Sequence, residues 1–293
     1  MAGQLKEVRN RISSVQSTQQ ITKAMKMVSA AKLRRAQDAI VQMRPYARKL
    51  QELLSNIVSN SEGEVGMKLA EERPIERVLL IVMTSDRGLA GAFNANLIKL
   101  AKATIAERYA AQHQKGNVTI WNVGKKGFEH FSKNGFKADA TYKDLFLNLK
   151  FESVQEISKA AMKAYESKEF DVIEIIYSQF RNAATQRFEV ERFLPIPKVE
   201  KKEGDIKADF IFDPNKAELI EELMPKILNT QLFKAALDTH ASEHGARMTA
   251  MDKASENANE MLRSLKISYN RARQAAITTE LTEIVSGAAA LQG

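Results

Sequence analysis

The sequence predicts an α/β protein: a long antiparallel coiled coil of N- and C-terminal helices plus a three-layer α/β (Rossmann-like) domain with a mainly parallel sheet. Three observations predict this class. Residues 4–44 and 246–286 each run for 41 residues without glycine or proline, and an unbroken helix of that length spans roughly 60 Å. Both stretches carry residues at heptad spacing, which is typical of paired helices. Between them, short apolar runs alternate with helical segments, as in a parallel sheet covered by helices.

The N-terminal stretch is predicted to form one long helix with an interrupted apolar seam. Apolar residues at heptad spacing cover residues 5–15 and again 33–57. Gln19 and Thr22 place polar groups between these two parts, and the sequence therefore predicts a shift of phase there. The apolar face is then expected to pass to Ile21, Met25 and Val28. Pro45 is expected to bend this helix, because it removes one backbone hydrogen bond.

The middle of the chain is predicted to contain three buried parallel strands, within residues 76–86, 117–124 and 170–180. The helices that accompany them are predicted over residues 92–112, 128–133 and 152–167, the last with Val154, Ile157, Ala161 and Tyr165 on its inner face. Residues 188–197 and 209–214 predict an antiparallel pair, because the loop that joins them contains no crossover helix. From Asn215 the chain is predicted to be helical to its end, apart from Pro225 and Gly245.

The C-terminal helix carries a seam of small and weakly apolar residues. Alternate gaps of four and three from Leu237 select Ala241, His244, Met248, Met251, Ser255, Ala258, Leu262, Leu265, Tyr269, Ala272, Ala276 and Thr279. Such a seam lets a partner helix approach closely, and the N-terminal helix is the simplest partner. The sequence thus predicts three parts: an N-terminal coiled-coil helix (1–60), an α/β domain (70–214) and a C-terminal coiled-coil helix (215–293).

Positive charge is concentrated at the N-terminus. The chain has a net charge of +8, while its first 50 residues hold 11 Lys or Arg against two acidic residues, a charge of +9, so the other 243 residues carry about −1. An acidic protein surface is the favoured partner of this helix. The alternative is a basic coiled-coil protein that binds nucleic acid; it is disfavoured because apolar residues interleave with the charges.

No group of residues in the sequence indicates an active site, a cofactor or a metal. The chain has no cysteine, which excludes disulfides, thiolate metal sites and cysteine nucleophiles. His240 and His244 have the i, i+4 spacing of a metal-binding pair, but a solvated or seam position is favoured. The glycine-containing loop within residues 84–97 precedes a helix and could hold an anion; it lacks the known phosphate-binding patterns, so a packed tight turn is favoured. Glu280 and Glu283 are interpreted as solvated or partner-paired.

The chain also has no apolar run of 18 or more residues and no secretory signal at its N-terminus, so a soluble protein is expected.

Three motifs resemble the gamma subunit family of F-type ATP synthases. Residues 21–37 (ITKAMKMVSAAKLRRAQ) are similar to the N-terminal shaft motif of the family. Residues 85–94 (SDRGLAGAFN) are similar to a loop of its α/β domain, with Ala90 where many members have cysteine. Residues 269–291 (YNRARQAAITTELTEIVSGAAAL) are similar to its C-terminal signature. The motifs occur in the family's order over nearly the whole chain.

The resemblance implies a non-catalytic rotor subunit of the central stalk, which couples ion flow through the membrane sector to ATP synthesis or hydrolysis. The implied partners are a ring of alpha and beta subunits, the epsilon subunit and the membrane ring of c subunits, with one copy of this chain per complex and no nucleic acid. The implied location is the cytoplasmic face of a bacterial cell membrane. No catalytic residue, cofactor or metal is implied.

The resemblance also implies two sets of partner-binding residues. Those expected to contact beta subunits around the upper shaft are Arg273, Gln274, Thr278 and Glu280. Those of the basic segment, expected to face acidic loops of beta, are Lys23, Met25, Lys26, Lys32, Arg34 and Arg35.

Overall fold

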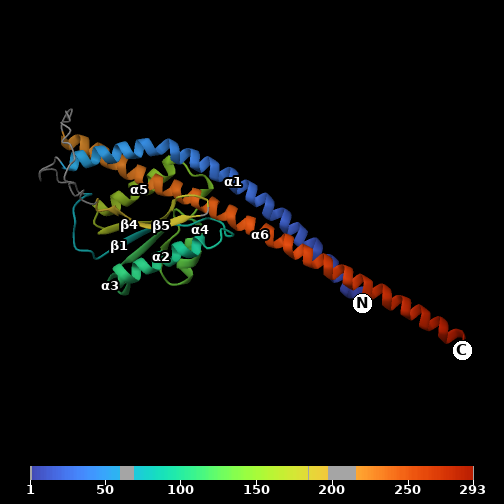
Figure 1. Cartoon of the computed structure of the whole chain (residues 1–293). Coiled ribbons are helices and arrows are strands. Elements are labelled where there is room, and N and C mark those ends of the chain that lie inside the picture. The colour runs from blue at the N-terminus through green and yellow to red at the C-terminus, as the bar shows by residue number, and fades with distance from the viewer. Residues whose placement is uncertain (1, 60–68, 184, 197–215, 293) are drawn as a thin grey trace. The chain divides into compact units, whose positions relative to one another are not determined.

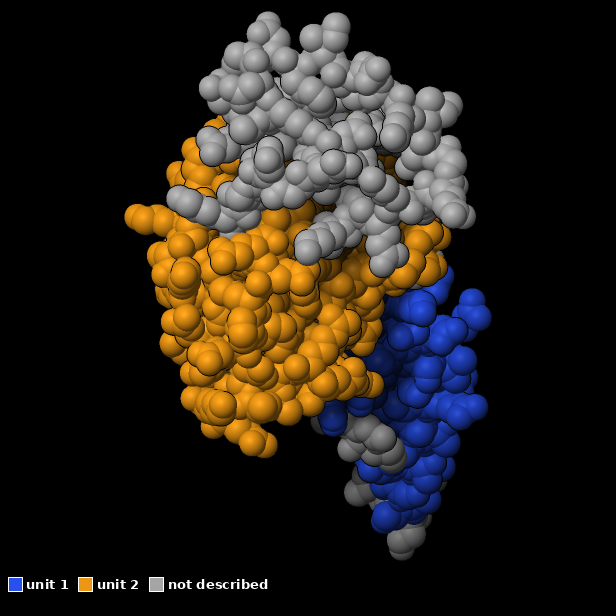
Figure 2. Space-filling view, turned by 90° about the vertical axis from the view of Figure 1, so that its left-hand side faces the viewer, with its two compact units in different colours: residues 1–29, 248–293 blue, residues 30–247 orange. Residues whose placement is uncertain are grey.

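The computed structural model describes residues 2–59, 69–183, 185–196 and 216–292 (Figure 1). The chain forms two compact units, which we name the helical unit (residues 1–29 and 248–293) and the α/β unit (residues 30–247) (Figure 2). Their boundaries fall inside the two long helices, α1 (Ala2–Ser59) and α6 (Lys216–Gln292). The division into domains at residues 60, 70 and 215 stays a prediction. No described helix is long and apolar enough to cross a membrane.

The α/β unit is built on a sheet whose described strands have the order β3-β2-β1-β4-β5. The strands are β1 (Val78–Met83), β2 (Val118–Val123), β3 (Lys137–Asp139), β4 (Val172–Phe180) and β5 (Gln186–Leu194). β1 pairs in parallel with β2 and β4, and β2 pairs in parallel with β3. The three predicted parallel strands are confirmed. β3 was not predicted, because it has three residues and no apolar run.

The predicted closing strand is also present, with a partner that the sequence did not predict. β5 pairs in antiparallel fashion with β4, from Ile173 opposite Leu194 to Phe180 opposite Gln186. The expected partner, residues 209–214, lies outside the described residues. β4 and β5 follow each other in the chain and pair in antiparallel fashion, so they form a β-hairpin at this edge of the sheet.

Helices cover both faces of the sheet. They are α2 (Phe93–Arg108), α3 (Ala110–Gln114), α4 (Lys125–Lys133), the 3-10 turn η1 (Leu145–Leu147), α5 (Phe151–Glu166) and part of α6. The predicted helix over 92–112 is broken at Tyr109, which has a non-helical backbone and a buried side chain. The inner face predicted for α5 is confirmed, because Val154, Ile157, Ala161 and Tyr165 are fully buried.

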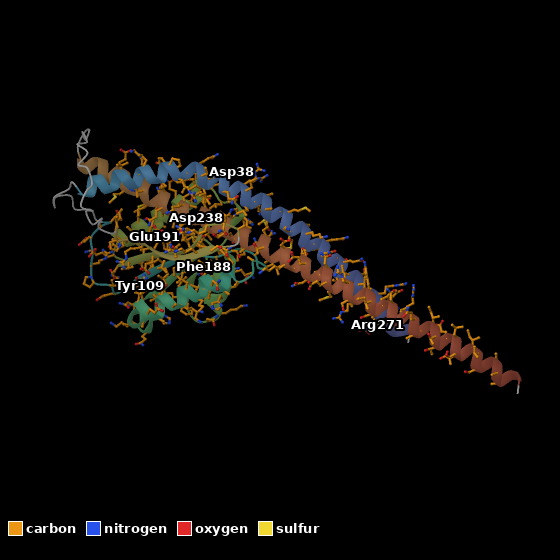
Figure 3. All side chains as sticks on the ribbon, viewed as in Figure 1. Asp38, Tyr109, Phe188, Glu191, Asp238 and Arg271 are labelled. Atoms are coloured by element: carbon orange, nitrogen blue, oxygen red, sulfur yellow. The ribbon has the colours of Figure 1, made fainter. Side chains whose placement is uncertain are left out.

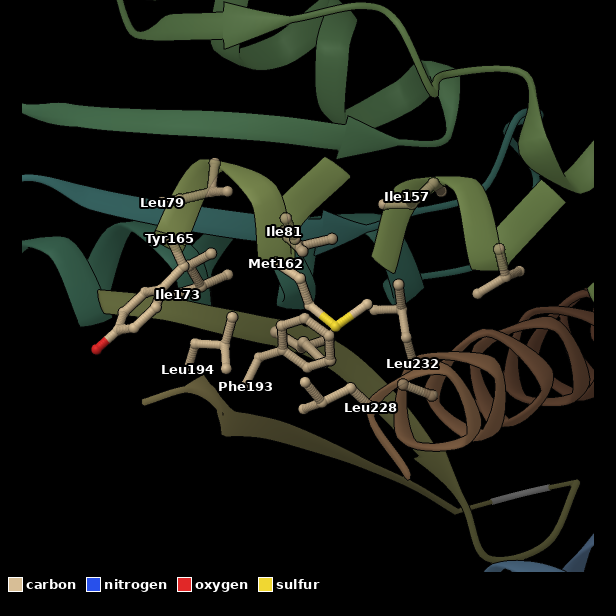
Figure 4. Close-up of a cluster of buried hydrophobic side chains, with 14 of the residues drawn as sticks. Leu79, Ile81, Ile157, Met162, Tyr165, Ile173, Phe193, Leu194, Leu228 and Leu232 are labelled. Carbon is tan, nitrogen blue, oxygen red and sulfur yellow. The ribbon is translucent and has the colours of Figure 1, made fainter. Parts of the chain in front are cut away.

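β1 separates two apolar cores, because successive side chains of a strand point to opposite faces. Leu79, Ile81 and Met83 pack with α5 and α6 in one core (Figure 4). Val78, Leu80 and Val82 pack with α2 and α4 in the other core. All six residues have no exposed surface, so the predicted three-layer arrangement is confirmed.

The helical unit is an antiparallel pair formed by the ends of α1 and α6. The side chain of Arg9 donates to Tyr269, and Gln19 donates to Asn259. Thr22 and Ser255 are joined by a buried hydrogen bond of 2.7 Å, and Lys26 pairs with Asp252 at 2.5 Å. As the residue number rises on α1 it falls on α6, which confirms the predicted antiparallel coiled coil.

The predicted phase shift in α1 is wrong. One heptad register is buried or half-buried throughout, namely residues 5, 8, 12, 15, 19, 22, 26, 29, 33, 36, 40, 43, 47 and 50; residues 25, 30, 37 and 39 beside it are also half-buried. Ile21 and Val28 are instead 59% and 58% exposed. The register survives its polar positions because Gln19, Thr22 and Lys26 meet polar partners on α6.

The seam predicted for α6 is confirmed. Leu237, Ala241, His244, Met251, Ser255, Ala258 and Leu262 are buried. The remaining members of the seam are half-buried. α6 continues through Pro225 and Gly245, so neither of these predicted interruptions ends the helix. α1 also continues through Pro45, and the bend expected there stays a prediction.

Candidate functional site

Large apolar side chains are exposed on the helical unit. On α1 they are Ile21, Met27 and Val28, which are 58% to 71% exposed. On α6 they are Met261, Ile267, Ile277, Leu281, Ile284 and Val285, which are 47% to 69% exposed. Exposed apolar residues that recur along one unit mark an interaction surface. The sequence pattern of α1 alone favours Ile21 and Val28 for the seam, and only the register of both helices together shows that they face outward.

The end of α6 is exposed on all sides. Every residue from Glu280 to Ala290 is exposed, and the contact between Arg9 and Tyr269 is made within the first turns of α1. No described residue of α1, which begins at Ala2, covers this end. An uncovered helix with Leu281, Ile284 and Val285 on its surface needs a partner from another chain.

The four candidate residues near this end are all exposed. Arg273, Gln274, Thr278 and Glu280 lie in the helical unit. The hydroxyl of Thr278 donates to the carbonyl oxygen of Gln274 at 3.0 Å. Among the described residues no ion pair is formed by Arg273 or Glu280, so both charges are available to a partner.

The basic candidate residues on α1 fall into two groups. Lys23, Lys32, Arg34 and Arg35 are exposed, and none of them forms an ion pair within the described residues. Lys26 is different, because its ammonium group pairs with Asp252 inside the helical unit. Met25 is half-buried. The structure therefore leaves four of the six residues fully available for a partner.

The loop between β1 and α2 is a tight turn anchored to α6, as the favoured interpretation predicted. The guanidinium of Arg247 donates to the carbonyl oxygens of Arg87 (3.0 Å) and Gly88 (3.2 Å). Asn94 accepts the backbone N–H of Ser85 at 2.9 Å, which ties the start of the loop to α2. Leu89 and Gly91 have φ angles of 63° and 58°, a left-handed backbone that suits a turn. The loop is fixed by the protein's own side chains.

Arg247 is itself buried, and it pairs with Glu243 at 2.6 Å. Burial raises the pKa of Glu243, while the charge of Arg247 opposes this shift. The pair therefore joins α6 to the β1–α2 loop through charges that are hidden from water.

His240 and His244 form a hydrogen-bonded pair in which His244 is buried and His240 is half-buried, which contradicts a solvated position and confirms a seam position for His244. Their Nε2 atoms are 3.1 Å apart, and Arg247 donates to Nδ1 of His244 at 3.4 Å. Nδ1 of His244 is therefore unprotonated, so its Nε2–H donates to Nε2 of His240, and His240 carries its proton on Nδ1. The ring of His240 also stacks on Phe146.

Both histidines are held neutral. Burial lowers the pKa of His240 to about 4, and the charges of Lys32 and Arg247 act in the same direction. Burial lowers the pKa of His244 to about 3, with contributions from His240, Arg247 and Lys32. Over the described parts of the chain, no group of three or more His, Cys, Asp or Glu side chains could hold a metal ion.

Comparison with known proteins identifies the family. The sequence pattern of the family described as ATP synthase matches residues 4–291. The ATP synthase gamma chain of Cytophaga hutchinsonii is 54% identical over 290 residues, 98% of each chain. That of Flavobacterium johnsoniae is 51% identical over 289 residues, 99% of each chain.

A solved structure has the same fold. A chain of the Euglena gracilis mitochondrial ATP synthase (OSCP/F1/c-ring, rotational state 3) is 20% identical, with a TM-score of 0.67 over 99% of this chain and 95% of that one. Nothing in these comparisons supports the nucleic-acid-binding alternative. The chain belongs to the ATP synthase gamma chain family.

Proposed function

We propose that this chain turns inside a ring of alpha and beta subunits and contacts the ring through the exposed surface of the helical unit and through exposed basic residues of α1. As a gamma chain it is the non-catalytic subunit of the central rotor stalk, and ATP is made or hydrolysed on other subunits. The observation that supports the proposed contact is the uncovered end of α6, where Leu281, Ile284 and Val285 are 57% to 69% exposed. A surrounding ring would remove these side chains from water.

The candidate partner-binding residues have separate roles in this proposal. Arg273, Gln274, Thr278 and Glu280 would contact beta subunits near the end of α6, since all four are exposed. Lys23, Lys32, Arg34 and Arg35 would meet acidic loops of beta, because their charges are unpaired among the described residues. Met25 and Lys26 would contribute less, because Met25 is half-buried and Lys26 pairs with Asp252. Rim charges of this kind set the rate and orientation of association more than its strength.

Rotation would act on the ring through differential contacts. The exposed apolar residues of the helical unit lie on two different helices, so the unit presents different chemistry in different directions. A ligand shifts a conformational equilibrium only by its differential affinity for the two states. A shaft that presents a different side to each catalytic subunit would therefore favour a different conformation in each of them.

The α/β unit would contact the epsilon subunit and the ring of c subunits, with one copy of this chain in each complex. The gamma chains of Cytophaga hutchinsonii and Flavobacterium johnsoniae are bacterial relatives of high identity, which supports a place at the cytoplasmic face of a bacterial cell membrane. The structure from Euglena gracilis contains F1 and a c-ring, which supports these classes of partner.

Substitution at the end of α6 tests the proposed contact. Leu281→Glu with Ile284→Glu places charges on the surface that the ring would cover, so coupled ATP synthesis in membrane vesicles should fall at least tenfold. Leu147→Glu is a matched control, because Leu147 is 63% exposed and lies in the α/β unit. Co-purification with alpha and beta subunits shows whether the variants assemble. Synthesis equal to that of the control, with normal assembly, would refute the contact.

A further inference from the structure

A cationic cleft lies within the α/β unit. It is a cleft of about 440 Å³ between α1, the carboxyl end of β4 and α6. Its lining residues are Ile40, Met43, Arg44, Ala47, Gln179, Phe180, Arg181, Lys234 and Asp238. The volume is within the range of sites that hold small ligands.

Three cations line this cleft against one carboxylate. Arg44 comes from α1, Arg181 follows β4 and Lys234 comes from α6. Within the described residues none of the three forms an ion pair, and their separation in the chain shows that the fold brings them together. Two guanidinium groups and one ammonium group are the donors that proteins use to bind phosphate-like anions, because arginine matches two oxygens at once.

The single carboxylate is Asp238, which lies on α6 and is 4% exposed (Figure 3). Burial raises the pKa of Asp238 to about 6, and the charge of Glu191 of β5 also raises it. The charges of Lys234 and Arg44 and a hydrogen bond from the backbone N–H of Phe180 lower this pKa and only partly offset the effect of burial. Tyr177 of β4 faces the same region and donates to Glu191. Asp238 therefore carries its negative charge at pH 7.5 and loses it below pH 6.

We propose that Arg44, Arg181 and Lys234 bind a tetrahedral oxyanion in this cleft, either free inorganic phosphate or a phosphate group of a nucleotide, and that the charge of Asp238 opposes this binding. Protonation of Asp238 removes a negative charge beside the anion, so binding tightens as the pH falls. By linkage, the bound anion favours the protonated carboxyl group. Binding of a phosphate compound in the cleft and protonation of Asp238 therefore favour each other. This linkage does not depend on the contacts with the ring.

Equilibrium dialysis of the full chain with radiolabelled sulfate tests this proposal. Sulfate has the shape of phosphate and keeps its charge between pH 5.5 and 7.5, so a pH dependence reports on the protein. At constant ionic strength, binding should be severalfold tighter at pH 5.5 than at pH 7.5. The upper limit is about 25-fold, the ratio of the protonated fractions of a group with a pKa of about 6.

Three variants make the test specific. Arg44→Gln with Arg181→Gln should weaken sulfate binding at least tenfold at pH 5.5. Arg11→Gln, an exposed arginine in the helical unit, is the matched control and should bind as the wild type does. Asp238→Asn keeps an acceptor for the N–H of Phe180 and should bind tightly at both pH values, with a pH ratio near one.

Competition distinguishes the two sources of the anion. Displacement of sulfate by ATP at lower concentration than by inorganic phosphate assigns the site to a nucleotide, and the reverse order assigns it to free phosphate. Equal sulfate binding by the wild type and the double arginine variant would overturn the site, and so would the absence of binding. Wild-type binding that does not change with pH would overturn the role of Asp238. Because these measurements use the chain alone, their failure leaves the proposed contacts with the ring intact.

Discussion

The hydrogen-bonded pair of His240 and His244 makes the α/β unit sensitive to acid. In the unfolded chain His240 and His244 titrate near the ordinary pKa of about 6.5, whereas in the folded chain their pKa values fall to about 4 and about 3. Between these values the unfolded state binds protons that the folded state excludes. Stability is therefore fully present above pH 6.5 and is lost as the pH falls below it.

The size of the loss follows from the shifts. At pH 5, which is 1.5 pH units below the unfolded pKa, each histidine lowers the free energy of unfolding by about 2 kcal/mol, at about 1.36 kcal/mol per pH unit. The pair therefore lowers it by at most about 4 kcal/mol. Asp238 acts in the opposite direction, because its raised pKa of about 6 stabilises the folded state on acidification. Its contribution between pH 7.5 and 5 is roughly 1 kcal/mol. Because the wild type and the histidine variants all keep Asp238, its contribution cancels when their losses between the same two pH values are compared.

Urea unfolding of the full chain measures this effect. Trp121 is the one tryptophan; it lies on β2 and packs against Tyr142 and Phe170, so its fluorescence reports on the α/β unit. His240→Gln with His244→Gln should lose about 4 kcal/mol less than the wild type between pH 7.5 and 5. His113→Gln, an exposed histidine, should lose as much as the wild type. An equal loss in the double variant and the wild type would refute the reasoning.

Three further predictions concern single contacts, and urea or thermal unfolding checks each of them. Arg247→Met should destabilise the α/β unit by about 3–5 kcal/mol, because it leaves Glu243 buried and unpaired and leaves the carbonyl oxygens of the β1–α2 loop without their hydrogen-bond donor. A loss of stability below about 1 kcal/mol would contradict this role of Arg247. Gly124→Ala should cost at least about 3 kcal/mol, because its Cβ would lie 2.1 Å from the carbonyl oxygen of Thr84 at a φ of 106°. Gly135→Ala is its control, with a φ of 76° and no atom within 4 Å, and should cost about 1 kcal/mol. Lys26→Asp and Asp252→Lys should each destabilise the helical unit and together restore it, with a coupling of up to about 1 kcal/mol for a half-exposed pair; additive single effects would show that the pair contributes nothing.

Most elements of the fold could be predicted because their signals are local. The apolar runs of β1, β2 and β4 are continuous, and the heptad spacing of α6 needs no knowledge of its partner. β3 and the break at Tyr109 could not be predicted, because both depend on neighbours in the sheet and in the core. The cleft around Asp238 could not be predicted either, since its cations come from three distant segments.

The candidate site could be predicted only in part, because its local signals are visible in the sequence while its contacts between distant segments are not. The spacing of His240 and His244 indicated a pair, but its burial and its tautomers depend on Phe146 and Arg247. The exposed charges of α1 were visible in the sequence. The pairing of Lys26 with Asp252 was not, because it requires the alignment of residues on two helices that are 226 positions apart in the chain.

The part of α1 for which the predicted phase shift is wrong explains how the exposed apolar residues of the helical unit are positioned. A pattern taken from α1 alone favours Ile21 and Val28 for the seam, because they are apolar while Gln19 and Thr22 are polar. The structure has the opposite arrangement, since the polar residues of α1 meet polar residues of α6, and Thr22 and Ser255 share a buried hydrogen bond. Buried polar contacts specify the register of paired helices more than they add stability. A slip of the pair would leave these groups unsatisfied, and it would also move Ile21 and Val28 relative to the exposed residues of α6. The polar positions in the seam therefore hold the outward-facing apolar residues of both helices at fixed places, as the proposed contact with several subunits in turn would require.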